Sequence, residues 1–144
     1  MKGKTHKYMK KFIILLLCTA TLGLVSCKKD TIVQNVLPRT ILYDIPTNSW
    51  KTSDGGRSYF TTINVPENNE SFNQSGAVVV SLSFDSQRKV YDALPSVVDG
   101  FSYNFTSEPG YVLIFVEDVN RQIINPPSGT IRAKIVLVDS EIID

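Results

Sequence analysis

Apolar and polar residues alternate along most of the chain beyond residue 39, with the two-residue period of β-strands. In residues 77–85, AVVVSLSFD, one predicted face is apolar and the other carries Ser81 and Ser83. Residues 100–106, GFSYNFT, repeat the pattern with aromatic side chains at every second position. Both segments are therefore predicted to be strands with one buried face, formed by Val78, Val80, Leu82 and Phe84 in the first and by Phe101, Tyr103 and Phe105 in the second.

Further strands are predicted at segments that share this apolar and β-branched character. Segment 111–118, YVLIFVED, is apolar on both faces, so we expect it in the centre of a sheet. In segment 130–139 one face is apolar, while Arg132 and Lys134 point to water. The remaining strands are expected within 39–46, 57–66 and 89–95. About seven or eight short strands at this spacing predict an all-β domain, a single antiparallel β-sandwich that is immunoglobulin-like or related.

Short polar segments predict how the strands are joined. Asp54-Gly55 separates TNSWKTS from RSYFTTINVP, which indicates a hairpin with a type I′ turn because glycine accepts a positive φ. Pro109-Gly110 suits the central positions of a type II turn. The Asp85 carboxylate is placed to cap a turn after its strand. Segment 67–76 is expected to hold one helical turn ended by Gly76.

The first 26 residues have the pattern of an export signal. Five lysines and no acid precede an apolar stretch at 12–24, which is 13 residues long. A membrane-spanning helix needs about 20 apolar residues, whereas the apolar part of a cleaved signal has roughly 7–15. Residues 1–26 are therefore predicted to be a cleaved signal helix.

Leu24-Val25-Ser26-Cys27 resembles the lipobox of bacterial lipoproteins. The resemblance implies cleavage between Ser26 and Cys27 and a diacylglycerol on the Cys27 thiol. The resemblance therefore implies a lipidated cysteine and a tether at residues 27–38, followed by a domain at residues 39–144. The alternative is an ordinary signal cut after Ala20, which would leave Cys27 as a free thiol.

The lipobox and the strand layout together resemble the small β-sandwich lipoproteins of the Bacteroidota. That resemblance implies a lipid anchor in the bacterial outer membrane, on the periplasmic face or the cell surface. Asp30-Thr31-Ile32 also resembles the O-glycosylation sequon of that phylum, with Thr31 as the acceptor. Alternatively, Thr31 is simply part of a β-prone segment.

Charge and residue types after position 26 exclude several functions. Five of the fifteen Lys and Arg lie in the signal, which leaves ten against fourteen acids, a net charge of −4. This balance argues against nucleic-acid binding. The only histidine is His6, so a lipidated mature chain has neither imidazole nor free thiol for a catalytic triad or a zinc site. We therefore expect no enzyme activity, no cofactor and no metal.

Weaker candidates for chemistry remain. The carboxylate pairs Glu117 with Asp118 and Asp85 with Asp92 could in principle cleave glycosides, but they are expected to be turn and surface acids. The oxygens of EDVN and DSEIID lack the spacing of a calcium loop. Trp50 could stack on a sugar together with Tyr59, or pack in the core.

The sequence thus predicts an envelope lipoprotein that binds membrane lipid through Cys27. The expected function is a non-catalytic interaction or accessory module with an envelope protein or a glycan as its partner. Two alternatives stay open: a glycan-binding or glycan-cleaving lipoprotein, and a subunit of a surface fibre in which one chain completes another's sheet.

Overall fold

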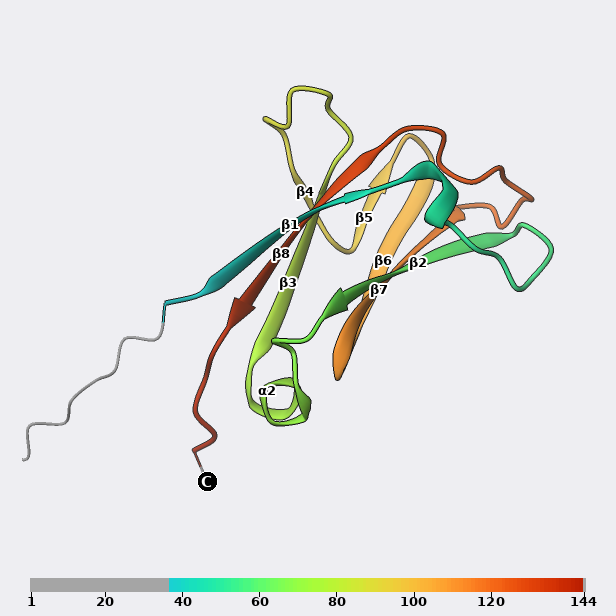
Figure 1. The fold of residues 1–144 in the computed structure, drawn as a ribbon. Helices are drawn as coiled ribbons and strands as arrows, with labels where there is room; N and C mark the ends of the chain where they lie inside the picture. Colours follow the sequence, from blue (N-terminus) through green and yellow to red (C-terminus); the bar gives the residue numbers. More distant parts are fainter. Residues whose placement is uncertain (1–36, 144) are drawn as a thin grey trace, which may run out of the picture. The chain divides into compact units, whose positions relative to one another are not determined.

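The structure is a computed structural model that describes residues 37–143, and these residues form two four-stranded antiparallel sheets (Figure 1). The predicted signal, the Ser26–Cys27 cleavage and lipidation site, and Thr31 all lie outside the described residues. The first strand begins at Arg39, the residue at which the sequence placed the start of the domain.

Sheet A contains the first and last strands of the domain. Its order is β1-β8-β3-β4, with β1 at Arg39–Ile45, β8 at Ile131–Val138, β3 at Ala77–Ser83 and β4 at Asp92–Ala93. Figure 1 shows β1 and β8, blue-green and dark red, lying side by side, and their register pairs Arg39 with Leu137. The last strand therefore lies inside the sheet, between β1 and β3.

Sheet B is built mainly from consecutive hairpins. Its order is β2-β7-β6-β5, with β2 at Ser58–Val65, β7 at Gly110–Asp118, β6 at Phe101–Glu108 and β5 at Ser96–Val98. The strand predicted to be central from its two apolar faces is β7, and it lies between β2 and β6 as expected.

Two short helices complete the fold of residues 37–143. A 3-10 turn, η1, spans Thr47–Ser49 after β1, and α2 spans Glu70–Ser75 between β2 and β3. The Asn69 side chain accepts a hydrogen bond from the Phe72 backbone N–H, as an N-cap residue does, and Gly76 follows the last helical residue. The single helical turn predicted in 67–76 is confirmed, and its Phe72 ring is buried in the core.

The core lies between the inner faces of the two sheets. Every second residue of β3, β7 and β8 points inward, as the sequence pattern predicted, and most of these side chains are fully buried. The buried apolar residues of these three strands are Val80, Leu82, Val112, Ile114, Val116, Ile131, Ala133, Ile135 and Leu137. Burial of this apolar surface is the main term that stabilises the sandwich.

The predicted all-β antiparallel sandwich is confirmed, with eight strands in the described residues. Its strand order is not that of an immunoglobulin constant domain, in which the first strand pairs with the second. Here β1 pairs with β8, so the domain is a β-sandwich whose strand order differs from the immunoglobulin order.

One hairpin differs from its prediction. Residues Lys51 and Phe60 pair through two backbone hydrogen bonds, so the loop around Asp54-Gly55 is much longer than a two-residue type I′ turn. Asp54 organises this loop, since its carboxylate accepts hydrogen bonds from the backbone N–H groups of Arg57 and Ser58. The two-residue Asp-Gly hairpin lies instead at Asp99-Gly100, where both φ angles are positive, at 49° and 81°.

Candidate functional site

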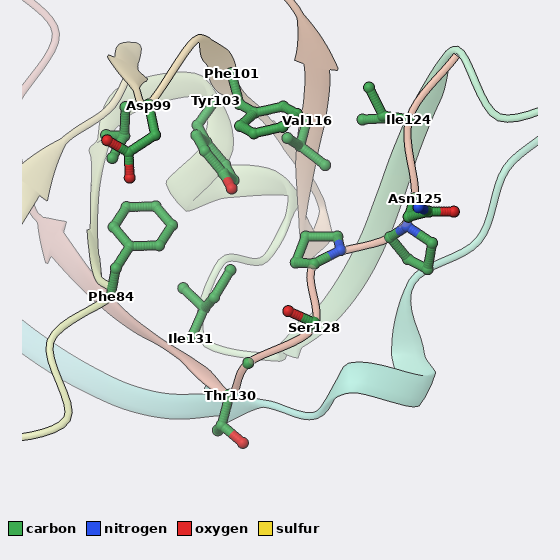
Figure 2. A pocket seen from close by; sticks show the side chains of 14 residues that line it. Phe84, Asp99, Phe101, Tyr103, Val116, Ile124, Asn125, Ser128, Thr130 and Ile131 are labelled. Carbon is green, nitrogen blue, oxygen red and sulfur yellow. The ribbon is translucent and has the colours of Figure 1, made fainter.

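A cavity of about 350 Å³ opens at one end of the sandwich, and we call it the end cavity. It lies where β3 ends and β8 begins in sheet A, and where the β5–β6 turn meets the end of β7 in sheet B. The loop between β7 and β8 supplies the rest of the wall. Figure 2 shows the lining residues, which are Phe84, Val98, Asp99, Phe101, Tyr103, Val116 and the segment 124–131.

The loop that walls the cavity is shaped by its prolines. Pro126 and Pro127 lack a backbone N–H and therefore do not continue a β-ladder, so the chain crosses from sheet B to sheet A without strand pairing. The Ile124 N–H donates to the carbonyl of Gly56 at 2.8 Å, which ties this loop to the loop before β2. The Ile124 side chain also packs against the core. The wall is thus held at a fixed place beside the cavity.

Aromatic rings form the inner wall. The Phe84 and Tyr103 ring centroids are 4.9 Å apart with planes inclined by 58°, and Phe101, also on β6, lies beside Tyr103 (Figure 2). Tyr103 is only 6% exposed, so its ring is fixed by packing. Phe84 continues the alternation of β3 just beyond the strand's last residue. Together these side chains give the cavity a rigid apolar surface.

Asp99 is the charged side chain of the end cavity. None of the residues that line the cavity is lysine, arginine or histidine. Within residues 37–143, Asp99 takes part in no ion pair and its carboxylate accepts no hydrogen bond. Burial raises the pKa of the Tyr103 phenol above its ordinary value, and the negative charge of Asp99 raises it further. The cavity therefore has an apolar interior, and the solvent-exposed carboxylate of Asp99 lies at its edge.

The type I′ turn explains why the carboxylate lies there. Val98 pairs with Phe101, so Asp99 and Gly100 form the whole connection between β5 and β6. Aspartate tolerates a positive φ better than most residues, and glycine accepts it freely. Figure 2 shows the Asp99 carboxylate beside the rings of Phe84 and Tyr103.

The residues that the sequence considered for sugar stacking do not line this cavity. Trp50 is 7% exposed and packs in the core, which is the second of the two roles left open for it, and so it offers no ring face to a ligand. Tyr59 is half-buried against the same core. Neither aromatic ring forms an exposed platform.

One member of each carboxylate pair caps a turn. Asp85 caps its turn as predicted, accepting hydrogen bonds from the backbone N–H groups of Gln87 and Lys89. Asp118 accepts from the N–H of Asn120 at 2.7 Å in the same way. Glu117 lies on the outer face of sheet B, turned away from Asp118. Among residues 37–143 no group of three or more His, Cys, Asp or Glu side chains could hold a metal ion.

The outer face of sheet B carries a second feature that the sequence did not indicate. The Phe60 and Phe115 rings, opposite each other on β2 and β7, have centroids 6.4 Å apart. Leu113 and the 47%-exposed Tyr111 extend the row along β7. Polar side chains flank it, and the register places Ser58, Thr62, Asn64, Ser102, Asn104 and Thr106 beside it. We call this row and its flanks the aromatic strip.

Sequence reasoning missed the end cavity because its lining comes from segments that lie far apart along the chain. Two local signals were present: a second Asp-Gly pair at Asp99-Gly100 and the consecutive Pro126-Pro127 in a long connection. Neither signal indicates that the turn at Asp99-Gly100 and the loop at Pro126-Pro127 lie together at one end of the sandwich. That meeting depends on the strand order.

The fold and the cavity define a small antiparallel β-sandwich with an acidic, aromatic-walled pocket at one end. No protein-family model, curated protein or solved structure matches the chain. In the part of the chain from 37 to 143, no helix has the length and hydropathy needed to cross a bilayer.

Proposed function

We propose that this protein is a lipoprotein of the bacterial outer membrane, anchored through Cys27, whose β-sandwich is a non-catalytic binding module. The anchor is supported by the basic and apolar segments before residue 27 and by the lipobox-like Leu24-Val25-Ser26-Cys27. Two or more acyl chains on one cysteine hold a protein stably at a membrane, whereas a single chain binds only marginally.

The observation that carries the binding function is the end cavity. Its volume of about 350 Å³ falls within the range of small-molecule sites, roughly 300–1,000 Å³. Such sites combine apolar and aromatic walls with a few polar groups that orient the ligand. Here Phe84 and Tyr103 supply the walls, and Asp99 and Asn125 supply polar groups. The proposed module therefore binds a small molecule, or a group projecting from another envelope component, in this cavity.

The anchor is tested by substituting Cys27. In cells producing Cys27→Ala, we expect the protein to be lost from the outer-membrane fraction, because it can carry no diacylglycerol. Cys18→Ala is the matched control, because that cysteine lies inside the predicted signal, and it should fractionate as the unsubstituted protein does. A Cys27→Ala protein found in the outer-membrane fraction in the same proportion as the control overturns the anchor.

The binding role is tested by photocrosslinking in cells. A photoreactive residue at Pro127, on the cavity wall, is expected to give a discrete adduct, and the same residue at Val79, 46% exposed on the outer face of sheet A, is the control. Adding Ser128→Trp, which fills the cavity mouth, should abolish the Pro127 adduct. Equal adducts at both positions, or an adduct that survives Ser128→Trp, would exclude the cavity as the binding site.

Glycan binding is the second candidate, and the aromatic strip favours it. Sugar rings stack on aromatic faces, while amides and hydroxyls bind the sugar hydroxyls. Phe60 and Phe115 lie among such groups on sheet B. In affinity electrophoresis through polysaccharide gels, Phe115→Ala should lose any retardation that Val79→Ala keeps. Identical migration of the two variants and the unsubstituted protein in every gel argues against this candidate.

A further inference from the structure

We infer that the end cavity binds a small organic cation, an alkylated ammonium group carried on an apolar body. The inference rests on the proposed binding function and adds the chemical class of the ligand. It follows from the juxtaposition of one unpaired carboxylate with several aromatic rings in a cavity of about 350 Å³.

The charge of the cavity favours a positive ligand. Asp99 lies on the wall without an ion-pair partner among the described residues, and no lysine, arginine or histidine lines the cavity. Arg88 approaches the rim, where its guanidinium donates to the Thr130 carbonyl at 3.4 Å, but it is paired with Asp44. A ligand cation would thus meet a solvent-exposed carboxylate that is paired with no cationic side chain of the described residues.

The aromatic walls favour the same ligand. The face of an aromatic ring carries negative electrostatic potential and attracts a cation within about 6 Å of its centroid. Phe84, Phe101 and Tyr103 lie together on the cavity wall, and Asp99 lies beside two of these rings (Figure 2). Alkylated ammonium groups are weakly hydrated and apolar at their surface, so they fit a site that offers rings and a carboxylate together.

Other ligand classes fit this lining less well. A neutral apolar ligand would gain nothing from the Asp99 carboxylate, which is exposed to solvent at the edge of the cavity. An anion would be repelled by it. A hard metal ion requires several converging oxygens, whereas most of the lining here is carbon. An organic cation gains from both the charge and the rings.

The experiment uses two ligands of nearly identical shape. Choline and 3,3-dimethylbutan-1-ol differ in that a quaternary nitrogen is replaced by carbon, so only the first is charged. Each is titrated against the full chain in a non-ionic detergent without ammonium groups, and binding is followed by saturation-transfer NMR and calorimetry. We expect choline to bind at least about tenfold more tightly than the alcohol.

Two variants assign the site. Asp99→Asn removes the charge and keeps the turn, since Asn-Gly is also favoured in type I′ turns, and should weaken choline binding about tenfold with little change for the alcohol. Glu117→Gln removes one negative charge from the outer face of sheet B and should leave both affinities unchanged. Comparing the two variants distinguishes an effect of the Asp99 carboxylate from an effect of the overall negative charge of the domain.

The outcomes separate the ligand class from the binding function. If the alcohol binds as tightly as choline, or if Asp99→Asn has no effect, the cation inference is overturned and the cavity remains a binding site. If neither ligand binds, the inference is overturned as well, and the Pro127 crosslinking experiment then decides independently whether the cavity has another ligand. If Glu117→Gln weakens choline binding as much as Asp99→Asn, the effect is nonspecific and the inference fails.

Discussion

Arg132 and Asp44 lie directly opposite each other in the register of β8 and β1 and form two parallel hydrogen bonds. Arg132 Nε donates to Asp44 Oδ1 and Nη2 donates to Oδ2, each at 2.8 Å. Arg88, from the loop after β3, lies 3.4 Å from the same carboxylate. The hydrogen bonds from Arg132, and then the charges of both arginines, hold the pKa of Asp44 below its ordinary value. This cluster joins β1 to β8 on the outer face of sheet A.

Replacing Arg132 by lysine is expected to weaken this cluster modestly. Lysine keeps the charge but cannot donate two parallel hydrogen bonds to one carboxylate. Because both side chains are partly exposed, the loss of unfolding free energy should be no larger than that of an ordinary surface ion pair, and it should shrink at high salt. Urea unfolding at low and high salt measures it, with Lys51→Arg as a surface control. A loss well above that size would mean that the pair does more than a surface ion pair.

Gly76 and the Phe72 ring are in close contact at the end of α2. A Cβ placed on Gly76 would lie 2.5 Å from the ring, although the φ of Gly76, −85°, suits any residue. Gly76→Ala should therefore destabilise the domain by about 1–3 kcal/mol through overpacking alone. Adding Phe72→Leu should relieve the clash, so the double variant should be more stable than the two single losses predict. Strict additivity in thermal unfolding would refute this explanation.

At Gly110 the effect of backbone strain can be measured in the absence of a steric clash. Its φ is +86°, at the second central position of the β6–β7 turn, and nothing lies within 4 Å of a Cβ placed there. Gly110→Ala should cost about 1–2 kcal/mol, because a residue with a side chain rarely adopts this conformation. Gly129→Ala is the matched control, since its Cβ would also be in open space and its φ lies outside the left-handed region. Equal unfolding midpoints for the two variants would exclude strain at Gly110.

Acid stability should depend on Asp54. Hydrogen bonds from the Ser58 hydroxyl and backbone N–H lower the pKa of Asp54 far below the 3.9 or so of an unfolded chain. Between these two values the unfolded state binds the extra proton, so stability is fully present above the unfolded pKa and is lost as the pH falls through the folded one. Asp54→Asn, which binds no proton, should show a smaller decrease in stability below about pH 4. Urea unfolding across this range measures the difference, and parallel curves would contradict it.

Most strands could be predicted because a strand with one buried face alternates apolar and polar residues. The apolar pattern identified β3, β6, β7 and β8, and the two apolar faces of β7 placed it correctly inside a sheet. Prediction was poorer where burial depends on neighbouring segments. Ser83 was placed on the polar face of its strand, yet it is fully buried.

The Asp-Gly hairpin shows the same dependence on context. Both Asp54-Gly55 and Asp99-Gly100 offer the dipeptide that a type I′ turn requires. At Asp54 the carboxylate bonds to the following residues and organises a wide loop, while at Asp99 the strands pair up to the turn itself. The dipeptide alone does not distinguish the two. The end cavity depends on this difference, because the turn at Asp99 is what brings its carboxylate to the rings.

The position of β8 inside sheet A has a consequence for biogenesis. Within sheet A, β1 pairs only with β8, and β3 pairs with β8 along its whole length. A chain emerging from a ribosome or a translocation pore therefore cannot complete this sheet until its last strand is free, because β1 and β3 have no substitute for β8. Until then β1 and β3 lack the strand that joins them, so formation of sheet A depends on pairings between segments far apart along the chain and is expected to be slow.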